Sequence, residues 1–336
     1  MKKKLNKKLN IIILIIITLL VLYFSLKDNF KTTINQICSM NIWWLIVAFI
    51  FVILYWLFRS YAMFSIVKEE NKKFKFLQSF QLMLRTQFFN AVTPFATGGQ
   101  PFQVYYLNQC DISVASSTGL VVENFIVYQI ALVFLGLVAV ISNYFFHIFS
   151  EVHLLQKLVT LGFIINTAVI VVMFLVSFGK KINKKIINFG INILTKLKIV
   201  KDKEKKLNEW DNSINQFHKS ATILLKKKSV FIKSIFLNLL ALICLYLIPL
   251  ILFYSMGLYD KINGLETIVT SAYVMLIGSF VPIPGGTGGL EYGFVAFYGN
   301  FIKGGTLSAI MLIWRFITYY FGLIVGSIAV NMKRVK

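Results

Sequence analysis

The chain has 336 residues, 57% of them hydrophobic and 14% charged, and its mean hydropathy is +0.74. These values exclude an ordinary soluble domain and indicate an all-α integral membrane protein. The formal net charge is +22. Because the basic residues lie between apolar stretches, we expect anionic phospholipid as their partner and no directly bound nucleic acid.

The N-terminus reads MKKKLNKKLN and continues into an apolar run over residues 9–26. Basic residues before an apolar run are typical of a secretory signal. However, this run is long and no small-residue cleavage site follows it. We therefore expect it to be retained as a first transmembrane helix.

Six stretches are long and apolar enough to cross a hydrocarbon core, which needs about 20 helical residues. They cover residues 9–26, 42–66, 114–142, 154–178, 230–257 and 306–330. We expect residues 1–336 to form a single polytopic membrane domain.

Lysine placement predicts the orientation, because basic links stay in the cytoplasm. The N-terminus, the link VKEENKKFKF, residues 179–229 and the tail NMKRVK are rich in lysine, whereas the links after the first and third spans are poor in it. Threading six spans from inside places every lysine-rich segment in the cytoplasm. We expect a bacterial plasma-membrane protein with both termini cytoplasmic.

Two remaining apolar stretches, 76–109 and 264–302, each carry one copy of the pattern P-x-x-T-G-G, as PFATGG and PGGTGG. Each is too short for two ordinary crossings, and each has to return to the side from which it came. We therefore predict two re-entrant helical hairpins. Span, hairpin and span then recur as an inverted repeat over 42–142 and 230–330, joined by the span 154–178.

A turn inside the bilayer needs flexible backbone, helix-terminating prolines and groups that satisfy free amides. Such turns can also direct helix N-termini at an anion, for example a lipid phosphate. The alternative is a pair of packing kinks. The candidate structural prolines are Pro94, Pro101, Pro282 and Pro284. The candidate substrate-binding turn residues are Thr97, Gly98, Gly99, Gly285, Gly286, Thr287, Gly288 and Gly289.

Residues 179–229 form a basic cytoplasmic segment in which Leu207, Trp210, Ile214 and Phe217 recur at spacings of three and four. This spacing predicts an amphipathic helix. Two alternatives remain open: the helix lies on the cytoplasmic leaflet, or its apolar stripe packs on the bundle.

Ionisable residues inside spans are rare and are usually functional or paired. Glu123 and Arg315 occupy nearly equivalent places in the two repeats. We expect both to line a central cavity, where they pair with each other or hold two ends of a polar headgroup. Arg85 is a further candidate for lipid phosphate, and snorkelling is its alternative. We expect Arg59, near the end of its span, to snorkel.

Glu291 follows the second turn, where a carboxylate either caps the next helix or binds substrate; the cap is favoured. Gln100 and Gln103 are hydrogen-bonding candidates at the matching place in the first hairpin. Neither the histidines nor the cysteines form a metal or catalytic pattern, and there is no phosphate-binding fingerprint. We predict no metal site, no cofactor and no catalytic residues.

The segments TPFATGGQPFQVYYL, VVEN, FVPIPGGTGGLEYGF and IWRF together resemble the membrane region of bacterial lysylphosphatidylglycerol synthases, the multiple peptide resistance factor family. The resemblance implies a helical domain with re-entrant helices that moves aminoacylated phospholipid between leaflets and supports resistance to cationic antimicrobial peptides. It also implies that Glu123, Arg315, Pro284, Gly285, Gly286 and Glu291 are family positions. Gln103 and Asn124 depart from it, since many relatives carry arginine there. We expect a standalone form without the soluble synthase domain of the family.

Three functions remain open. The first is a lipid translocase acting on anionic or aminoacylated phospholipid, with lysyl-phosphatidylglycerol as a candidate. The second is a phosphatidylglycerol lysyltransferase or the membrane subunit of one, which would bring a separate lipid synthase as partner. The third is an ion-coupled solute transporter. The sequence favours a role without catalysis and leaves open whether the chain forms a homo-oligomer.

Overall fold

The computed structural model describes residues 30–149, 153–179, 185, 203–221, 226–279 and 281–335. Within these ranges every regular element is a helix, which confirms the all-α class. The expected first span at residues 9–26 lies outside the described residues.

Five segments of the described chain are long and apolar enough to cross a membrane, and they coincide with the five other expected spans. They are built from α3 (Ile42–Glu70), α6 (Val114–Phe146), α7 (His153–Phe178), α11 and α12 (Lys228–Tyr246 and Ile248–Ser255), and α15, η3 and α16 (Gly304–Arg315, Phe316–Tyr320 and Phe321–Asn331).

Side-chain caps explain where several of these helices begin. The Asn41 side chain accepts a hydrogen bond from the Trp43 amide, 2.9 Å away, at the start of α3. Ser113 Oγ accepts one from the Ser116 amide, 3.1 Å away, at the start of α6. Both bonds satisfy amides that have no partner inside the first helical turn, and so fix the helix starts.

Two spans are interrupted for different reasons. Pro249 has no amide hydrogen, and the break between α11 and α12 lies just before it. The last span instead widens into a π-helical turn over Phe316–Tyr320, between α15 and α16. Such turns often occur at functional sites, and this one directly follows Arg315.

The two stretches expected to form hairpins are helix–turn–helix units. The first consists of α4 (Phe76–Ala91), the turn η1 (Pro94–Ala96) and α5 (Gly99–Asn108). The second consists of α13 (Gly264–Gly278), η2 (Pro284–Gly286) and α14 (Gly289–Tyr298). At about 1.5 Å per residue each helix is too short to span a bilayer. That these units turn inside the bilayer stays a prediction.

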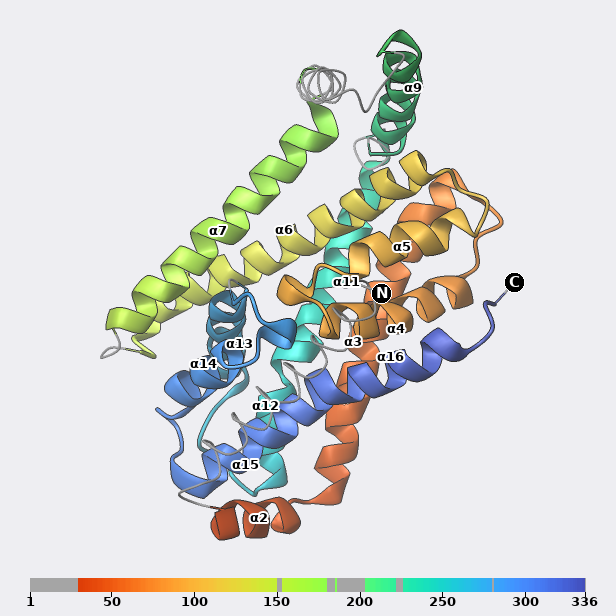
Figure 1. Ribbon diagram of the computed structural model, residues 1–336. Coiled ribbons are helices and arrows are strands. Elements are labelled where there is room, and N and C mark those ends of the chain that lie inside the picture. The colour runs from red at the N-terminus through yellow and green to blue at the C-terminus, as the bar shows by residue number, and fades with distance from the viewer. Residues whose placement is uncertain are drawn as a thin grey trace.

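The helix contacts are reciprocal between the two predicted repeats. Helix α3 packs on its counterpart α11 near the centre of the molecule (Figure 1). Helix α4 of the first hairpin packs on α16, and α13 of the second hairpin packs on α6. The turns η1 and η2 contact each other. A pair of repeats related by a two-fold axis requires this pattern of contacts, and the inverted repeat itself stays a prediction.

Two helices lie outside these repeats. The first, α2 (Phe30–Ser39), occupies a stretch that we expected to be a link, and it packs on α15. The second, α9 (Lys203–Ala221), is the expected amphipathic helix and contacts α6 and α7. Ile214 and Ala221 of α9 are buried, so its C-terminal half packs on the bundle. Figure 1 shows α9 and α2 at opposite ends of the molecule.

We predict that Gly99→Ala destabilises the first hairpin. A Cβ atom at Gly99 would lie 2.1 Å from Asn90 Oδ1 and 2.7 Å from Thr86 Cγ2. Overpacking of this kind costs roughly 1–3 kcal/mol, so the thermal unfolding midpoint of the purified protein in detergent should fall. Gly264→Ala is the matched control, because a Cβ there would meet nothing within 4 Å. Equal midpoints for both variants would contradict the close contact.

Candidate functional site

The two turns share an unusual backbone conformation. Phe95 and Ala96 in η1 both have φ of 52°, and Gly285 and Gly286 in η2 have φ of 68° and 63°. These values lie in the left-handed region, which side-chain-bearing residues seldom adopt. Phe95 and Ala96 are therefore strained, whereas Gly285 and Gly286 adopt the same region without strain. Strained backbone of this kind is concentrated at functional sites.

The threonine of each motif closes its turn in the same way. Thr97 Oγ1 donates a hydrogen bond to the Pro94 carbonyl at 3.0 Å, and Thr287 Oγ1 donates one to the Pro284 carbonyl at 2.9 Å. Pro94 and Pro284 each begin their turn, as expected. The P-x-x-T part of the pattern therefore describes one turn structure used twice.

Three of the four final motif glycines, Gly98, Gly99 and Gly289, are required for space, whereas Gly288 provides the expected bend. Gly98 has φ of −72°, and only Gly288 is left-handed, at 89°. A Cβ at Gly98 would lie 2.6 Å from Thr93 Cγ2, and one at Gly289 would lie 2.2 Å from Val281 Cγ2. Gly98, Gly99 and Gly289 therefore let each second helix start against the end of the first.

Polar side chains satisfy the amides at both helix starts. At α5, Asn90 Oδ1 accepts from the Gly99 amide at 3.0 Å, and Thr93 Oγ1 accepts from the Gly98 amide at 2.8 Å. At α14, Glu291 Oε2 accepts from the Gly288 amide at 2.7 Å. The favoured capping role of Glu291 is therefore confirmed. The first turn is capped by neutral groups and the second by a carboxylate.

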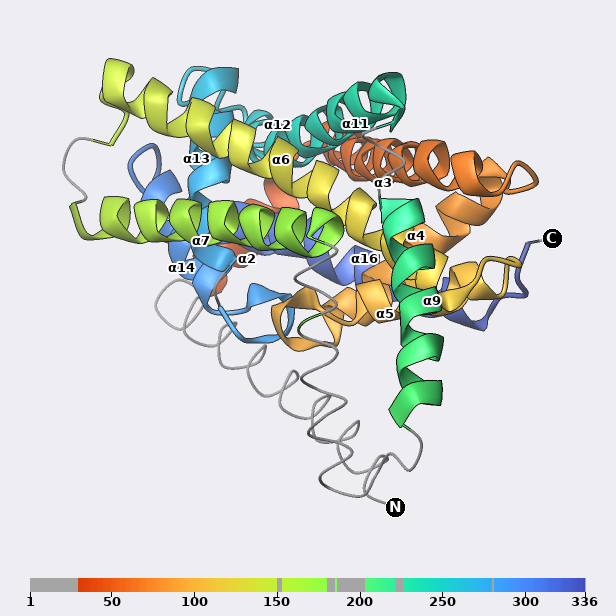
Figure 2. The same ribbon diagram turned by 90° about the horizontal axis from the view of Figure 1, so that it is seen from above.

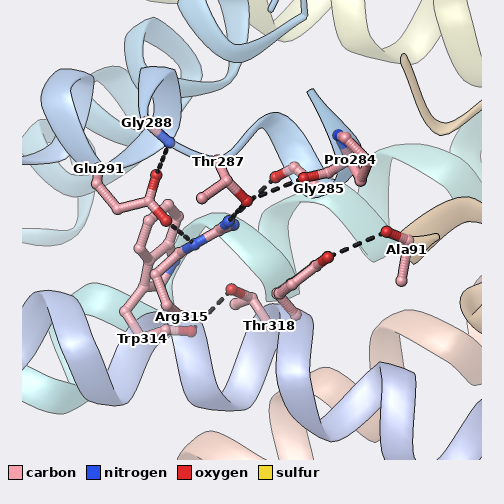
Figure 3. Close-up of polar contacts among 10 residues, drawn as sticks. Ala91, Pro284, Gly285, Thr287, Gly288, Glu291, Trp314, Arg315 and Thr318 are labelled. Atoms are coloured by element: carbon pink, nitrogen blue, oxygen red, sulfur yellow. Dashed lines mark hydrogen bonds and ion pairs between the residues drawn. The ribbon is translucent and has the colours of Figure 1, made fainter. Parts of the chain in front are cut away.

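Arg315 joins the end of α15 to the second turn. Its Nε lies 2.6 Å from Oε1 of Glu291, and both side chains are buried (Figure 3). Its Nη2 donates to the Gly285 carbonyl at 3.1 Å. Arg315 therefore forms its ion pair with Glu291, and the pairing with Glu123 considered from the sequence stays a prediction.

Tyr319 connects this ion pair to the first hairpin. Its hydroxyl donates to the carbonyl of Ala91 at the end of α4, 3.0 Å away, and the Arg315 guanidinium lies 4.7 Å from its ring centre. A Cβ at Gly285 would lie 2.3 Å from the Tyr319 ring. The π-helical turn thus contacts both hairpins at once.

A small polar cavity of about 50 Å³ lies among the helices of the first predicted repeat. Its lining comes from α3, α4, α5 and α6. The lining residues are Tyr55, Arg59, Met83, Thr86, Gln87, Asn90, Gln100, Gln103, Asn124 and Phe125. The expected site residues Gln100 and Gln103 are therefore together here, and the cavity has room for about one or two water molecules.

Several polar atoms around this cavity lack a hydrogen-bond partner within the part of the chain that the structure describes. They are Nε of Arg59, Oε1 of Gln100 and Oδ1 of Asn124. Buried polar groups are nearly always paired, because leaving one unpaired costs about 1–3 kcal/mol. These atoms therefore indicate a place prepared for a polar ligand or for water.

Arg59 was expected to snorkel, but it points inward. It lies eleven residues before the end of α3, about 16 Å at helical rise. Its guanidinium carbon lies 3.9 Å from the centre of the Tyr128 ring, and its Nη1 donates to the Tyr55 hydroxyl at 3.2 Å. Sequence reasoning missed this residue, and also Asn90, because polar side chains on an otherwise apolar helix do not reveal which neighbour they face.

Glu123 and Arg85 lie on α6 and α4, whereas the Arg315–Glu291 pair joins α15 to α14. Glu123 is 1% exposed and directly precedes the cavity residue Asn124 on α6. Arg85 donates from Nε to the Ala329 carbonyl at 2.9 Å and from Nη2 to the Met332 carbonyl at 2.7 Å. Arg85 therefore caps the C-terminus of α16, and its binding of lipid phosphate stays a prediction.

Comparison with known proteins gives two matches. The family described as the lysylphosphatidylglycerol synthase TM region matches residues 10–326. A UPF0104 membrane protein of Archaeoglobus fulgidus is 23% identical over 303 residues, which cover 87% of each chain. The family match includes both hairpins and the residues of the cavity.

We predict that Glu291→Gln strongly destabilises the protein, because it leaves the buried Arg315 guanidinium unpaired. Breaking a buried ion pair costs about 3–5 kcal/mol. Adding Arg315→Gln should recover part of that loss, since the double variant has no unpaired charge.

The measurement is the thermal unfolding midpoint of each purified variant in detergent. Lys72→Gln is the control, because it breaks the solvent-exposed Lys72–Glu69 pair and should cost about 1 kcal/mol or less. Additive effects of the two substitutions at Glu291 and Arg315 would contradict the pairing.

Proposed function

The chain belongs to the lysylphosphatidylglycerol synthase transmembrane-region family, and on this premise we propose that it moves phospholipid between the two leaflets of a membrane. The observation that carries the proposal is the polar cavity, where unpaired atoms of Arg59, Gln100 and Asn124 are buried between the first hairpin and two helices, α3 and α6, that are long and apolar enough to cross a membrane.

The chemistry of the cavity fits a phospholipid headgroup. An arginine guanidinium binds phosphate oxygens through charge-assisted hydrogen bonds. The side-chain amides of Gln100, Gln103 and Asn124 can bind hydroxyl or ammonium groups of the same headgroup. A charged headgroup without such partners pays a large desolvation penalty in hydrocarbon. The cavity would lower that penalty, and lysyl-phosphatidylglycerol is the candidate lipid.

Movement requires the cavity to open. A volume of about 50 Å³ is far below the roughly 300–1,000 Å³ of ligand pockets, so this conformation is closed to a headgroup. The two predicted repeats would rock against each other, as inverted repeats do in other transporters. The turns η1 and η2, which contact each other here, would separate during that step.

We place the protein in the bacterial plasma membrane with both termini cytoplasmic, because its basic links favour that side. Anionic or aminoacylated phospholipid would be its substrate, and a separate lipid synthase would supply the aminoacylated form. Transfer of a cationic lipid to the outer leaflet would reduce the binding of cationic antimicrobial peptides.

The test is lipid movement in liposomes that contain only the purified protein. Lysyl-phosphatidylglycerol and phosphatidylglycerol, labelled in one leaflet, are compared. We predict that Arg59→Gln slows movement about 10- to 100-fold, the kinetic equivalent of losing one hydrogen bond to a charged group. Glu123→Gln and Arg315→Gln should slow it as well.

Lys228→Gln is the matched control, because it removes one exposed positive charge outside the cavity and should leave the rate unchanged. If the wild-type protein moves neither lipid, the translocase proposal fails. That result would favour the two alternative functions, a membrane subunit of a lysyltransferase or a solute transporter.

A further inference from the structure

A large hollow of about 940 Å³ lies outside the site described above. It forms where the link between α3 and α4 and the link between α5 and α6 meet α9 and the C-terminal tail. Figure 2 shows the C-terminus and the α3–α4 link on the side of the molecule that α9 occupies. This hollow, unlike the cavity, is large enough to hold a lipid headgroup.

The hollow is lined by an excess of positive charge. Its acidic residues are Glu70 and Asp111. Its basic residues are Lys72, Lys73, Lys75, Lys219 and Arg334. The basic residues come from three separate segments, the α3–α4 link, α9 and the C-terminal tail, so the fold gathers them in one place. Even when Glu69, the ion-pair partner of Lys72, is counted, five cations stand against three anions, and a concave surface with this surplus attracts phosphate-bearing ligands.

The ends of two spans set the depth of the hollow. Helix α3 ends at Glu70 and α6 begins at Val114, so the hollow lies at the ends of two helices that are long and apolar enough to cross a membrane. Exposed apolar side chains stand beside it: Leu77 is 54% exposed and Val114 is 58% exposed. Polar lining with an apolar border is typical of the headgroup region of a bilayer. A site for a purely soluble anion does not require that border.

A row of polar side chains leads from the hollow toward the cavity between α4 and α5. Gln78 lines the hollow, and Gln81 follows it by three residues on α4. The Tyr106 hydroxyl donates to Oε1 of Gln81 at 3.0 Å. Further along, Nε2 of Gln103 donates to Oγ1 of Thr86 at 3.4 Å, and both residues line the cavity.

We propose that this hollow binds the phosphate of an anionic phospholipid headgroup in the adjoining leaflet and supplies that lipid to the cavity. The positive charge of the hollow, its position at the helix ends and its apolar border support the proposed binding. Its part in transport rests on the translocase function proposed above.

The test measures binding and not movement. The whole purified chain is titrated in detergent with short-chain phosphatidylglycerol, and the thermal unfolding midpoint is followed, because a ligand that binds the folded state stabilises it. Short-chain phosphatidylcholine, glycerol phosphate and inorganic phosphate are titrated in parallel. We expect phosphatidylglycerol to stabilise the protein most.

The double variant Lys73→Gln, Lys219→Gln removes two cations from the hollow and should weaken the apparent affinity for phosphatidylglycerol about tenfold or more. The matched control Lys261→Gln, Lys303→Gln removes two exposed cations elsewhere and should keep wild-type affinity. Lys73→Arg, Lys219→Arg keeps the charge and should also retain binding.

Equal affinity of the glutamine variant and its control would overturn the proposal. So would stabilisation by glycerol phosphate equal to that by phosphatidylglycerol, because the ligand would then be a soluble phosphate compound. Loss of lipid movement together with normal binding would count against the translocase function alone, and the proposed binding at the hollow would stand.

Discussion

The architecture depends on one constraint: a helix broken within apolar surroundings must have its free backbone groups satisfied by the protein itself. The chain meets this constraint twice. At the first turn the side chains of Asn90 and Thr93 accept from the amides that begin α5. At the second turn Glu291 accepts from the Gly288 amide, and Arg315 balances the resulting buried charge.

The caps of the two turns differ in chemistry, and the rest of the site depends on this difference. At the second turn, Arg315 pairs with the charged cap and connects η2 to α15. The adjoining π-helical turn contacts the first hairpin through Tyr319. At the first turn the caps are neutral, and unpaired polar atoms of Arg59, Gln100 and Asn124 lie around the cavity beside this hairpin. The buried ion pair therefore lies in the second predicted repeat, and the polar cavity lies in the first. Movement of headgroups would then depend on separating the contacting turns.

Much of the fold can be predicted from the sequence because it depends on local rules. Apolar length identifies the spans, and proline with glycine identifies both hairpins. The position of Glu291 three residues after Gly288 predicts the cap. Other features depend on tertiary contacts: the Arg315–Glu291 pair needs α14 and α15 to meet, and the inward position of Arg59 needs Tyr128 opposite it. The left-handed Phe95 carries no sequence signal, since its residue type disfavours that conformation.

The most direct test of this account is crosslinking of the two turns. Cysteines would replace Ala96 in η1 and Pro284 in η2, in a chain whose native Cys38, Cys110 and Cys244 are replaced by alanine. Lipid movement in liposomes would be measured before and after treatment with a short bifunctional maleimide, with each single-cysteine chain as a control. The account predicts that the crosslink forms and stops movement in the double-cysteine chain alone. A crosslinked protein that still moves lipid at the untreated rate would contradict it.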